Sequence, residues 1–447
     1  MVSERSKETL GKLENGTYRN NRTITLGGID FTAKDVLVKA PLVSRLNCYY
    51  VGGTGEGKTQ LANDICGYLK DSSCYSMGRP DFEPSELFRS LNLGFLTDLL
   101  KGKKTNPQLQ QSLEKLSGNV DKCFFYVDEL NRCPPIVQNY FFDFFDGKLV
   151  YNGQLVNLGK DGYSVGFASG NLGDGQFCGT SDTDRALKDR MHMIVSLDNT
   201  RFSPTEGDVL SVLTGRKTPR ARQTNDSSIN IEDIIELNRE FQETDIHPIY
   251  PILGLYLTRG LDFLQDHPEH SKKNIFDSWY HSNPESVRQD TDEGLIFPIS
   301  VRAALASQAL ASGLEFIADA KGEEVTDHTG LFLDALKLTI PYSGVLNPMF
   351  VNQKHGGNVY TAFDEAMEYS RAGINEREEG LTTAIAFAEA GLVNEVEPIL
   401  GEIAPPNTRW ESVANGIRQY AEECEENPTK EGQKLRDIIR GAYEEEN

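Results

Sequence analysis

The chain has 447 residues, of which 38% are hydrophobic and 25% charged, and its formal net charge is −22 at pH 7. A chain of this length is too long to fold around one ordinary hydrophobic core, so we expect two or three domains. The negative charge repels nucleic acid and anionic membranes at long range, and no apolar run approaches the ~20 residues that span a bilayer. Seven scattered cysteines without a C-x-x-C pair indicate reduced thiols and a cytoplasmic location.

The first strong motif is a glycine-rich octet between a predicted strand, Asn47–Val51, and a predicted helix, Gln60–Lys70. Its residues fit the phosphate-loop pattern G-x-x-x-x-G-K-[ST]: Gly52, Gly53, Thr54, Gly55, Glu56, Gly57, Lys58 and Thr59. Glycines let consecutive backbone N–H groups face the phosphates, beside the positive end of the helix. Lys58 would reach the β- and γ-phosphates, and Thr59 would ligate Mg²⁺. The octet, a Walker A motif, therefore predicts a site for ATP and magnesium.

A second motif follows after a short candidate strand, Cys74–Met77, a predicted helix, Pro84–Leu100, and a polar exposed stretch. The apolar run Lys122–Val127 ends in Asp128 and Glu129, as a buried parallel strand does where its tip meets a ligand. After a phosphate loop, this pair is typical of a Walker B motif. Asp128 would hold Mg²⁺, largely through water, and Glu129 would polarise the attacking water.

Further strands and helices alternate beyond these acids. The pattern predicts a helix over Asn131–Phe145, a hairpin around Asn152-Gly153, a strand over Tyr163–Ser169 that ends at Gly170-Asn171, a helix over Asp182–Arg190 and a strand over Met191–Leu197. Strands that alternate with helices after a phosphate loop indicate an α/β fold, with a parallel sheet sandwiched by helices.

The pattern changes beyond residue 200. A polar segment with Arg216, Lys217, Arg220 and Arg222 reads either as an exposed linker or as a nucleic-acid contact. Helices are predicted over 231–264, 300–317 and 329–340 and from residue 361 onward, with a loop-rich insertion at 265–295. The acidic runs near the C-terminus are typical of a solvated helix face, and residues 1–29 give little signal.

From about residue 40 to residue 345, the chain resembles a MoxR-type AAA+ ATPase. The stretches that carry the resemblance are Val127–Asn139, the hairpin, Phe167–Asn171, Asp189-Arg190-Met191 and Ser300–Ala303, in this order. The resemblance implies an AAA+ P-loop core and a smaller all-α lid. We divide the chain into an N-terminal segment (1–29), an AAA+ core (30–200), a linker (201–228), a helical lid (229–345) and a helical acidic extension (346–447).

The resemblance also implies roles for single residues. Asn171 matches the sensor-1 residue that orients the attacking water, and Arg190 matches the arginine finger that reaches the γ-phosphate of a neighbouring subunit. Arg302 matches the sensor-2 arginine of the lid, and Arg185 is a weaker candidate for the finger. With Glu129, we take Asn171, Arg190 and Arg302 as the catalytic set. The chain departs from the family at Thr54, where proline is common, in its long insertion and over residues 346–447.

The function implied by this resemblance is that of an ATP-hydrolysing, chaperone-like ring that remodels proteins, and no membrane span is expected. We expect a homo-oligomer, hexameric in relatives, that remodels, matures or assembles a partner protein or complex, with a von Willebrand A-domain protein as one candidate client. The alternative is a P-loop motor or loader on nucleic acid, against which the charge of −22 argues. A scaffold that binds ATP without turnover is the third reading, and the presence of Glu129 and Arg190 argues against it.

Overall fold

The computed structural model describes residues 2–53, 55–81, 85–91, 114–139, 141–151, 153–171, 185–215, 218, 229–265, 271–280 and 292–445. The chain divides into two compact units. The first comprises Met1–Thr244 and Gly313–Val325, and the second comprises Asp245–Ser312 and Thr326–Asn447. The predicted lid begins at residue 229, whereas helix α11 (Ile231–Gln242) packs on α1 and α2 within the first unit.

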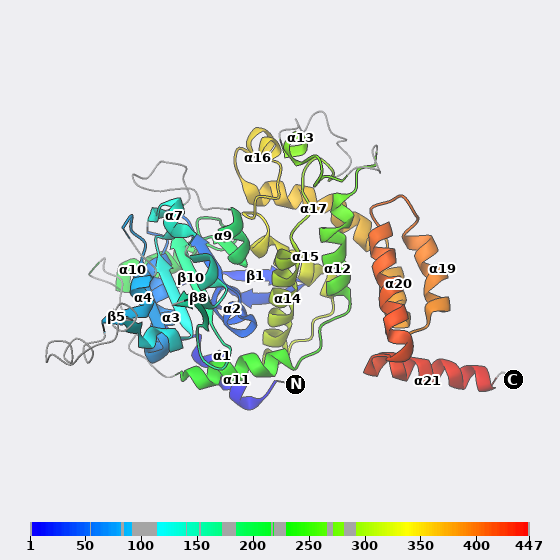
Figure 1. Cartoon of the computed structure of the whole chain (residues 1–447), viewed down its shortest axis with the longest axis horizontal. Coiled ribbons are helices and arrows are strands. Elements are labelled where there is room, and N and C mark those ends of the chain that lie inside the picture. Colours follow the sequence, from blue (N-terminus) through cyan, green and yellow to red (C-terminus); the bar gives the residue numbers. More distant parts are fainter. Residues whose placement is uncertain are drawn as a thin grey trace. The chain divides into compact units, whose positions relative to one another are not determined.

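The first unit is built on a five-stranded parallel sheet with the order β11-β3-β10-β7-β4 (Figure 1). Its strands are β3 (Cys48–Val51), β4 (Ser73–Met77), β7 (Phe124–Asp128), β10 (Val165–Gly170) and β11 (Met193–Ser196). Four of them are buried along their whole length, and only the edge strand β4 is partly exposed. Continuous apolar strands of this kind occur where helices cover both faces of a parallel sheet. The predicted strands and the predicted fold class are confirmed.

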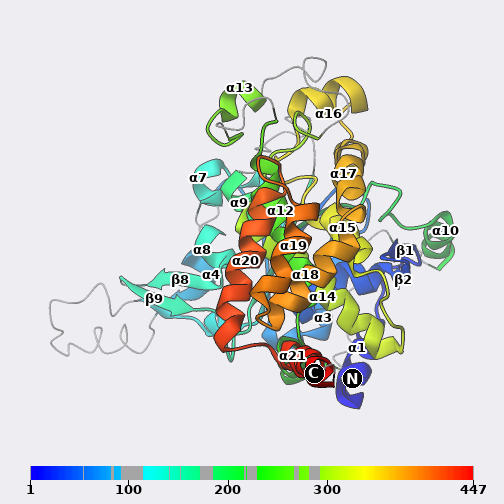
Figure 2. The same cartoon turned by 90° about the vertical axis from the view of Figure 1, so that its right-hand side faces the viewer.

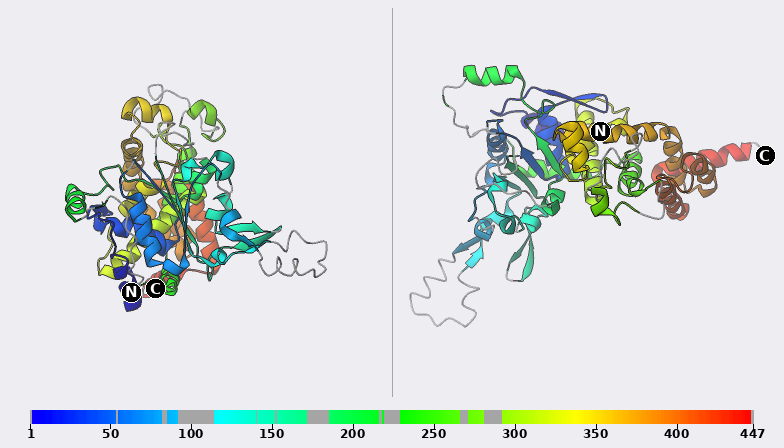
Figure 3. Two further views of the ribbon diagram at one scale, coloured as in Figure 1. Left: turned by 90° about the vertical axis from the view of Figure 1, so that its left-hand side faces the viewer. Right: turned by 90° about the horizontal axis from the view of Figure 1, so that it is seen from above.

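Several helices of the first unit follow or precede these strands. They are α2 (Ala40–Ser44), α3 (Lys58–Tyr68), α7 (Pro135–Gln138), α8 (Phe141–Phe145), α9 (Arg185–Arg190) and α10 (Glu206–Gly215). A cluster of aromatic rings joins α8 to the sheet, where the ring centroids of Phe125 and Phe144 lie 5.0 Å apart. Figure 3 shows α10 as the green helix that stands away from the sheet.

Three segments differ from the sequence-based expectation. In the predicted helix Pro84–Leu100, only α4 (Ser85–Phe88) is helical among the described residues, because β5 (Arg89–Leu91) pairs with β6 (Glu114–Leu116). The predicted helix Asn131–Phe145 is divided into a 3₁₀ turn, α7 and α8. Pro134 and Pro135 separate the turn from α7, since a proline cannot continue a helix from the preceding residues. The N-terminal region, which gave little signal, contains α1 (Glu4–Lys12) and a hairpin of β1 (Thr23–Leu26) and β2 (Ile29–Thr32).

The predicted hairpin is present as β8 (Lys148–Tyr151) and β9 (Gln154–Asn157). Gly153 has a φ of 76°, a left-handed conformation that suits glycine in a tight turn. Val150 and Leu155 are register partners and are 56% and 62% exposed. Figures 2 and 3 show that this hairpin extends away from the five-stranded sheet.

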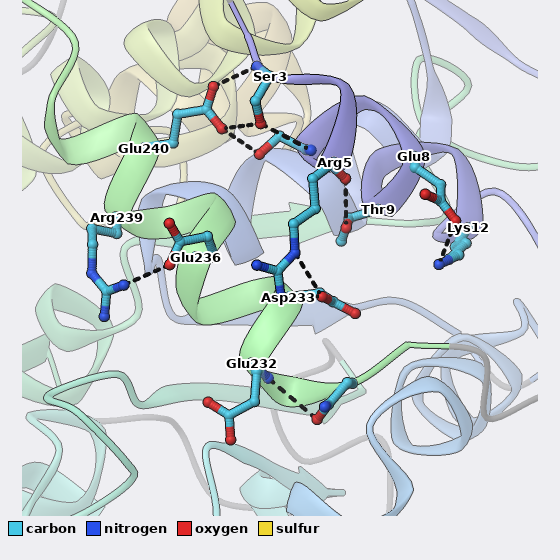
Figure 4. Close-up of polar contacts among 12 residues, drawn as sticks. Ser3, Arg5, Glu8, Thr9, Lys12, Glu232, Asp233, Glu236, Arg239 and Glu240 are labelled. Atoms are coloured by element: carbon cyan, nitrogen blue, oxygen red, sulfur yellow. Dashed lines mark hydrogen bonds and ion pairs between the residues drawn. The ribbon is translucent and has the colours of Figure 1, made fainter.

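Two polar clusters attach peripheral elements to the first unit. In Figure 4, Glu240 on α11 accepts hydrogen bonds from the Ser3 amide (2.5 Å) and from the Ser3 and Ser6 hydroxyls (2.7 and 2.5 Å). The second cluster is centred on Asp35, which is fully buried and lies 2.9 Å from Lys39 Nζ and 2.5 Å from Lys321 Nζ. Burial alone would raise the pKa of Asp35, but Lys39 and Lys321 hold it below its ordinary value.

The second unit is helical in the part of the chain that the structure describes. Its helices are α12 (Ile249–Thr258), α13 (Phe276–Tyr280), residues 301–312 of α14 (Val301–Lys321), α15 (His328–Thr339), α16 (Pro348–His355), α17 (Val359–Asn375), α18 (Glu378–Glu389), α19 (Val393–Ile403), α20 (Glu411–Glu426) and α21 (Lys430–Glu445). Helices α18, α19 and α20 lie side by side (Figures 1 and 2). Among the described residues, we find no helix with the length and apolarity needed to cross a membrane.

A buried ion cluster ties the insertion at 265–295 to the C-terminal helices of this unit. Asp292 is fully buried, pairs with Arg409 and accepts a 2.5 Å hydrogen bond from the Ser370 hydroxyl. Arg409 also lies 3.8 Å from the Glu293 carboxylate. Lys272 is buried nearby and donates to the Ile296 carbonyl at 3.0 Å, and desolvation lowers its pKa to about 8. The described residues Lys272, Asp292 and Glu293 are thus held in a cluster whose charges the protein itself neutralises.

Candidate functional site

The phosphate loop connects β3 to the first turn of α3, as the octet predicts. Gly52, Gly55 and Gly57 have φ values of 150°, 102° and 82°, which side chains with a Cβ rarely adopt. Gly57 is the N-cap of α3, and a Cβ there would lie 2.9 Å from Cε2 of Tyr18. The loop thus leads directly into the N-terminus of α3, a position that suits an anion. Thr54 lies outside the described residues.

Lys58 is the first residue of α3, and its ammonium group turns back over the loop. Nζ donates to the Gly52 carbonyl at 2.7 Å, to the Gly53 carbonyl at 2.6 Å and to Oδ1 of Asn171 at 3.2 Å. Burial lowers the pKa of Lys58, and nearby carboxylates, Asp198 foremost, oppose that shift. The structure therefore brings Lys58 together with Asn171, which follows directly after β10.

The two predicted magnesium ligands lie next to each other. The Thr59 hydroxyl donates to Oδ2 of Asp128 at 3.2 Å, and Asp128 is the last residue of β7. Two hard oxygen donors beside a phosphate loop fit Mg²⁺, which takes few protein ligands and completes its shell with phosphate and water. Among the described residues, no group of three or more His, Cys, Asp or Glu side chains suited to a metal ion occurs.

Glu129 follows Asp128 in a left-handed conformation, with a φ of 55° that is uncommon for a residue with a side chain. Its carboxylate forms a two-point ion pair with Arg132, with Nε–Oε2 at 2.6 Å and NH2–Oε1 at 3.0 Å. Its backbone amide donates to the Ser169 hydroxyl at 3.1 Å. The Glu129 side chain is 30% exposed, so water can reach it. The direction of Glu129 is therefore fixed by both its backbone and its side chain.

The two predicted arginines lie elsewhere. Arg190 ends α9, its Nε lies 3.1 Å from Asp146, and its guanidinium lies 4.7 Å from the centre of the Phe142 ring. The strand after Arg190, β11, is the direct neighbour of β3. Arg190 precedes the N-terminal end of β11, whereas the loop follows the C-terminal end of β3, about 17 Å along the strand direction.

Arg302 is the second residue of α14 and is half-buried in the second unit. The phosphate loop belongs to the first unit, so the sensor-2 role of Arg302 stays a prediction. The side chain of Arg185, the weaker candidate for the finger, lies outside the described side chains. The basic linker residues Arg216, Lys217, Arg220 and Arg222 also lie outside the described residues.

Sequence reasoning missed three side chains at this site. Tyr75 donates its hydroxyl to Oδ2 of Asp128 at 2.7 Å, and Ser169 donates to Oδ1 of the same carboxylate. Asp198 accepts a hydrogen bond from the Gly53 amide at 2.8 and 2.7 Å. Ser169 lies near the end of β10 and Asp198 follows β11. Because the carboxyl ends of parallel strands meet at one edge, their positions were a usable signal.

The comparisons with known proteins agree with this geometry. Residues 49–191 match a family model described as an AAA domain of the dynein-related subfamily. A solved structure from Cytophaga hutchinsonii, described as a candidate ATPase, superposes with a TM-score of 0.53 at 15% identity, covering 82% of this chain and 94% of that chain. At that identity the likeness concerns the fold alone. A search of curated proteins gave no significant match.

The matched range begins in β3 and ends just after α9, so it contains the phosphate loop, both acids of β7 and the segment after β10. ATPase activity is a property of AAA proteins, which typically form oligomeric rings. The parallel sheet, the loop and the family match together identify the first unit as one that contains an AAA+ P-loop NTPase domain.

Proposed function

We propose that this chain is a MoxR-like AAA+ ATPase that hydrolyses ATP with Mg²⁺ and uses the energy to remodel, mature or assemble a partner protein. One observation carries the proposal. At the carboxyl ends of β3 and β7 lie the Lys58 ammonium, the contact between Thr59 and Asp128, and the oriented Glu129 carboxylate. Phosphoryl transfer needs a cation to bind the phosphates, oxygen atoms to hold the metal ion and a carboxylate to polarise water, and this site contains all three.

The residues divide the work as follows. Backbone amides of the loop and Lys58 bind the phosphates, while Asn171, held 3.2 Å from Lys58 Nζ, helps to orient the attacking water. Thr59 and Asp128 would hold Mg²⁺, which when bound neutralises charge on the phosphate oxygens. Glu129 accepts a proton from the water, and its ion pair with Arg132 sets the direction of the carboxylate before the reaction.

The activity is tested by comparing phosphate release from the unmodified chain and from Glu129→Gln. The amide keeps the shape of the side chain but removes the charge that polarises water. ATP binding should persist while turnover falls by ~10²-fold or more, the scale of a positioned base. Equal turnover in both proteins would show that Glu129 is not the base.

Arg190 serves, in this proposal, the active site of a neighbouring subunit in a ring. Its distance along the strands from its own phosphate loop supports this, as does the tendency of head-to-tail interfaces to close into rings. A guanidinium at the transferred phosphate is worth ~10³-fold or more in rate. Mixing Arg190→Ala with Lys58→Ala subunits should restore part of the activity that each lacks alone. No recovery, with subunit exchange demonstrated, would remove Arg190 from this role.

The proposed client is a protein rather than a nucleic acid. The exposed apolar pair Val150 and Leu155 on the β8–β9 hairpin suits contact with a protein, and the net charge of −22 disfavours nucleic acid. A von Willebrand A-domain protein is one candidate client. Partner proteins captured by the ATP-loaded Glu129→Gln form should raise ATP turnover, and DNA should not. Stimulation by DNA that weakens steeply with salt would favour the nucleic-acid motor instead.

A further inference from the structure

The peptide bond between Gly52 and Gly53 lies between two opposite charges. Its carbonyl, on Gly52, accepts a hydrogen bond from Lys58 Nζ at 2.7 Å. Its amide, on Gly53, donates to both carboxylate oxygens of Asp198, at 2.8 and 2.7 Å. One rigid peptide plane thus connects the cation to the carboxylate. Hydrogen bonds aligned in this way polarise one another, so each strengthens the other.

The local backbone by itself fixes the orientation of this peptide plane only weakly. It joins two glycines, whose backbones reach both signs of φ with little penalty, so rotation of the plane between them costs little in strain. Such a rotation would turn the Gly52 carbonyl away from Lys58. The carboxylate of Asp198 opposes it, because the Gly53 amide would lose a charge-assisted hydrogen bond.

The approach of Asp198 is also close enough to constrain the sequence of the loop. A Cβ on Gly52 would lie only 2.9 Å from Oδ1 of Asp198, whereas one on Gly53 would make an ordinary contact at 3.6 Å. Asp198 itself is exposed and follows β11, the strand that pairs with β3. The end of a neighbouring strand therefore reaches the first turn of the loop.

We propose that Asp198 is a positioning residue for the phosphate-binding loop. Its carboxylate fixes the Gly52–Gly53 peptide, and through the Gly52 carbonyl it fixes Lys58 in the place where a phosphate would meet the ammonium. The inference rests on the proposed nucleotide binding. It adds a residue outside the octet that prepares the loop before the nucleotide arrives, and so lowers the ordering cost of binding.

The first test needs no nucleotide. Hydrogen exchange of the Gly53 amide, followed in the full chain, should be about tenfold faster in Asp198→Ala, because the loss of a hydrogen bond to a charged group removes its protection. Asp198→Asn should exchange at nearly the original rate, since its amide oxygen still accepts. Asp121→Ala removes the same charge from another exposed position of the first unit and should change nothing. Equal exchange in Asp198→Ala and the unmodified chain would overturn the proposal.

The second test measures affinity for ATP and ADP by calorimetry. Asp198→Ala should bind both about tenfold more weakly, Asp198→Asn should recover most of the loss, and the thermal unfolding midpoints should agree. Unchanged or tighter binding by Asp198→Ala would overturn the inference, since the carboxylate would then only repel phosphate. Lys58→Ala separates the two proposals: if it binds ATP as the unmodified chain does, the nucleotide site itself is wrong.

Discussion

The phosphate-loop site and the Asp292 cluster both concentrate charge, but they satisfy it in opposite ways. In the first unit, Lys58 is held by three neutral oxygens, those of Gly52, Gly53 and Asn171. In the second unit, Asp292 is fully buried against Arg409, and a serine hydroxyl completes the pair. The first arrangement holds a cation ready for an anion from outside. The second neutralises its charges from within.

This difference separates a functional from a structural use of charge. A cation oriented by neutral groups retains most of its attraction for a phosphate, whereas a buried ion pair that is already complete has little left to offer a ligand. Substitution should therefore affect ligand binding at the first site and the free energy of unfolding at the second. The following substitutions test that division.

The largest effect is expected for Lys58→Ala. It removes the cation placed over the loop, so ATP affinity should fall by ~10²-fold or more. The thermal unfolding midpoint without nucleotide should change little, because neutral carbonyls lose only a partner that water can replace. Calorimetric titration with ATP measures the first quantity, and Lys70→Ala, in the 3₁₀ turn that follows α3, is the control. If Lys58→Ala binds ATP with the affinity of the unmodified chain, the loop is not the nucleotide-binding element.

Arg409→Ala should act mainly on stability. It leaves the fully buried Asp292 without its cation, which typically costs about 3–5 kcal/mol of unfolding free energy. Arg418→Ala removes an exposed pair with Glu397 in the same unit and should cost less than about 1 kcal/mol. Urea unfolding compares the two variants. Equal losses of unfolding free energy in the two variants would mean that burial does not determine how much these ion pairs stabilise the protein.

Asp35→Asn tests whether the buried Asp35 cluster, which lies in the same unit as the loop, contributes to the free energy of unfolding. Lys39 and Lys321 hold the pKa of Asp35 in the folded protein below its ordinary value of about 3.9. The carboxylate therefore contributes its full share to the free energy of unfolding above the ordinary pKa. That share is lost as the pH falls through the lowered pKa of the folded protein. The stability gap between the two proteins, about 2 kcal/mol, should be constant from pH 7 to 5 and shrink below pH ~4. Exposed Asp30→Asn is the control. A gap that widens in acid would contradict the assignment.

The smallest effect is expected for Tyr75→Phe. It removes only the hydroxyl that donates to Asp128 at 2.7 Å, so the carboxylate should be less well oriented toward Thr59. The Mg²⁺ concentration needed for half-maximal ATP turnover should rise ~5-fold, the scale of one hydrogen bond. Tyr420→Phe, in the second unit, is the matched control. An unchanged magnesium requirement would leave Tyr75 as a packing residue beside Tyr126.

The sequence predicted those parts of the site that are contiguous in the chain. The loop around Lys58 and the acids Asp128 and Glu129 each carry their own pattern, with the strand before them. Tyr75 could not be found in this way, because its hydroxyl meets Asp128 only through the pairing of β4 with β7. The same holds for the strand Arg89–Leu91, whose partner lies beyond residue 110. Contacts made by strand pairing have no local signature.

The contact between Tyr18 and Gly57 has a practical consequence for protein production. The Thr17 and Tyr18 amides bind Oδ2 of Asp64 on α3, at 2.7 and 2.6 Å, and the Tyr18 ring lies against the last glycine of the loop. The first twenty residues, which gave little signal in the sequence, therefore contact both the glycine that caps α3 and α3 itself. A protein shortened by these residues would lose those contacts together with α1, which packs on α11, so we expect its phosphate loop to be less well ordered than that of the full chain.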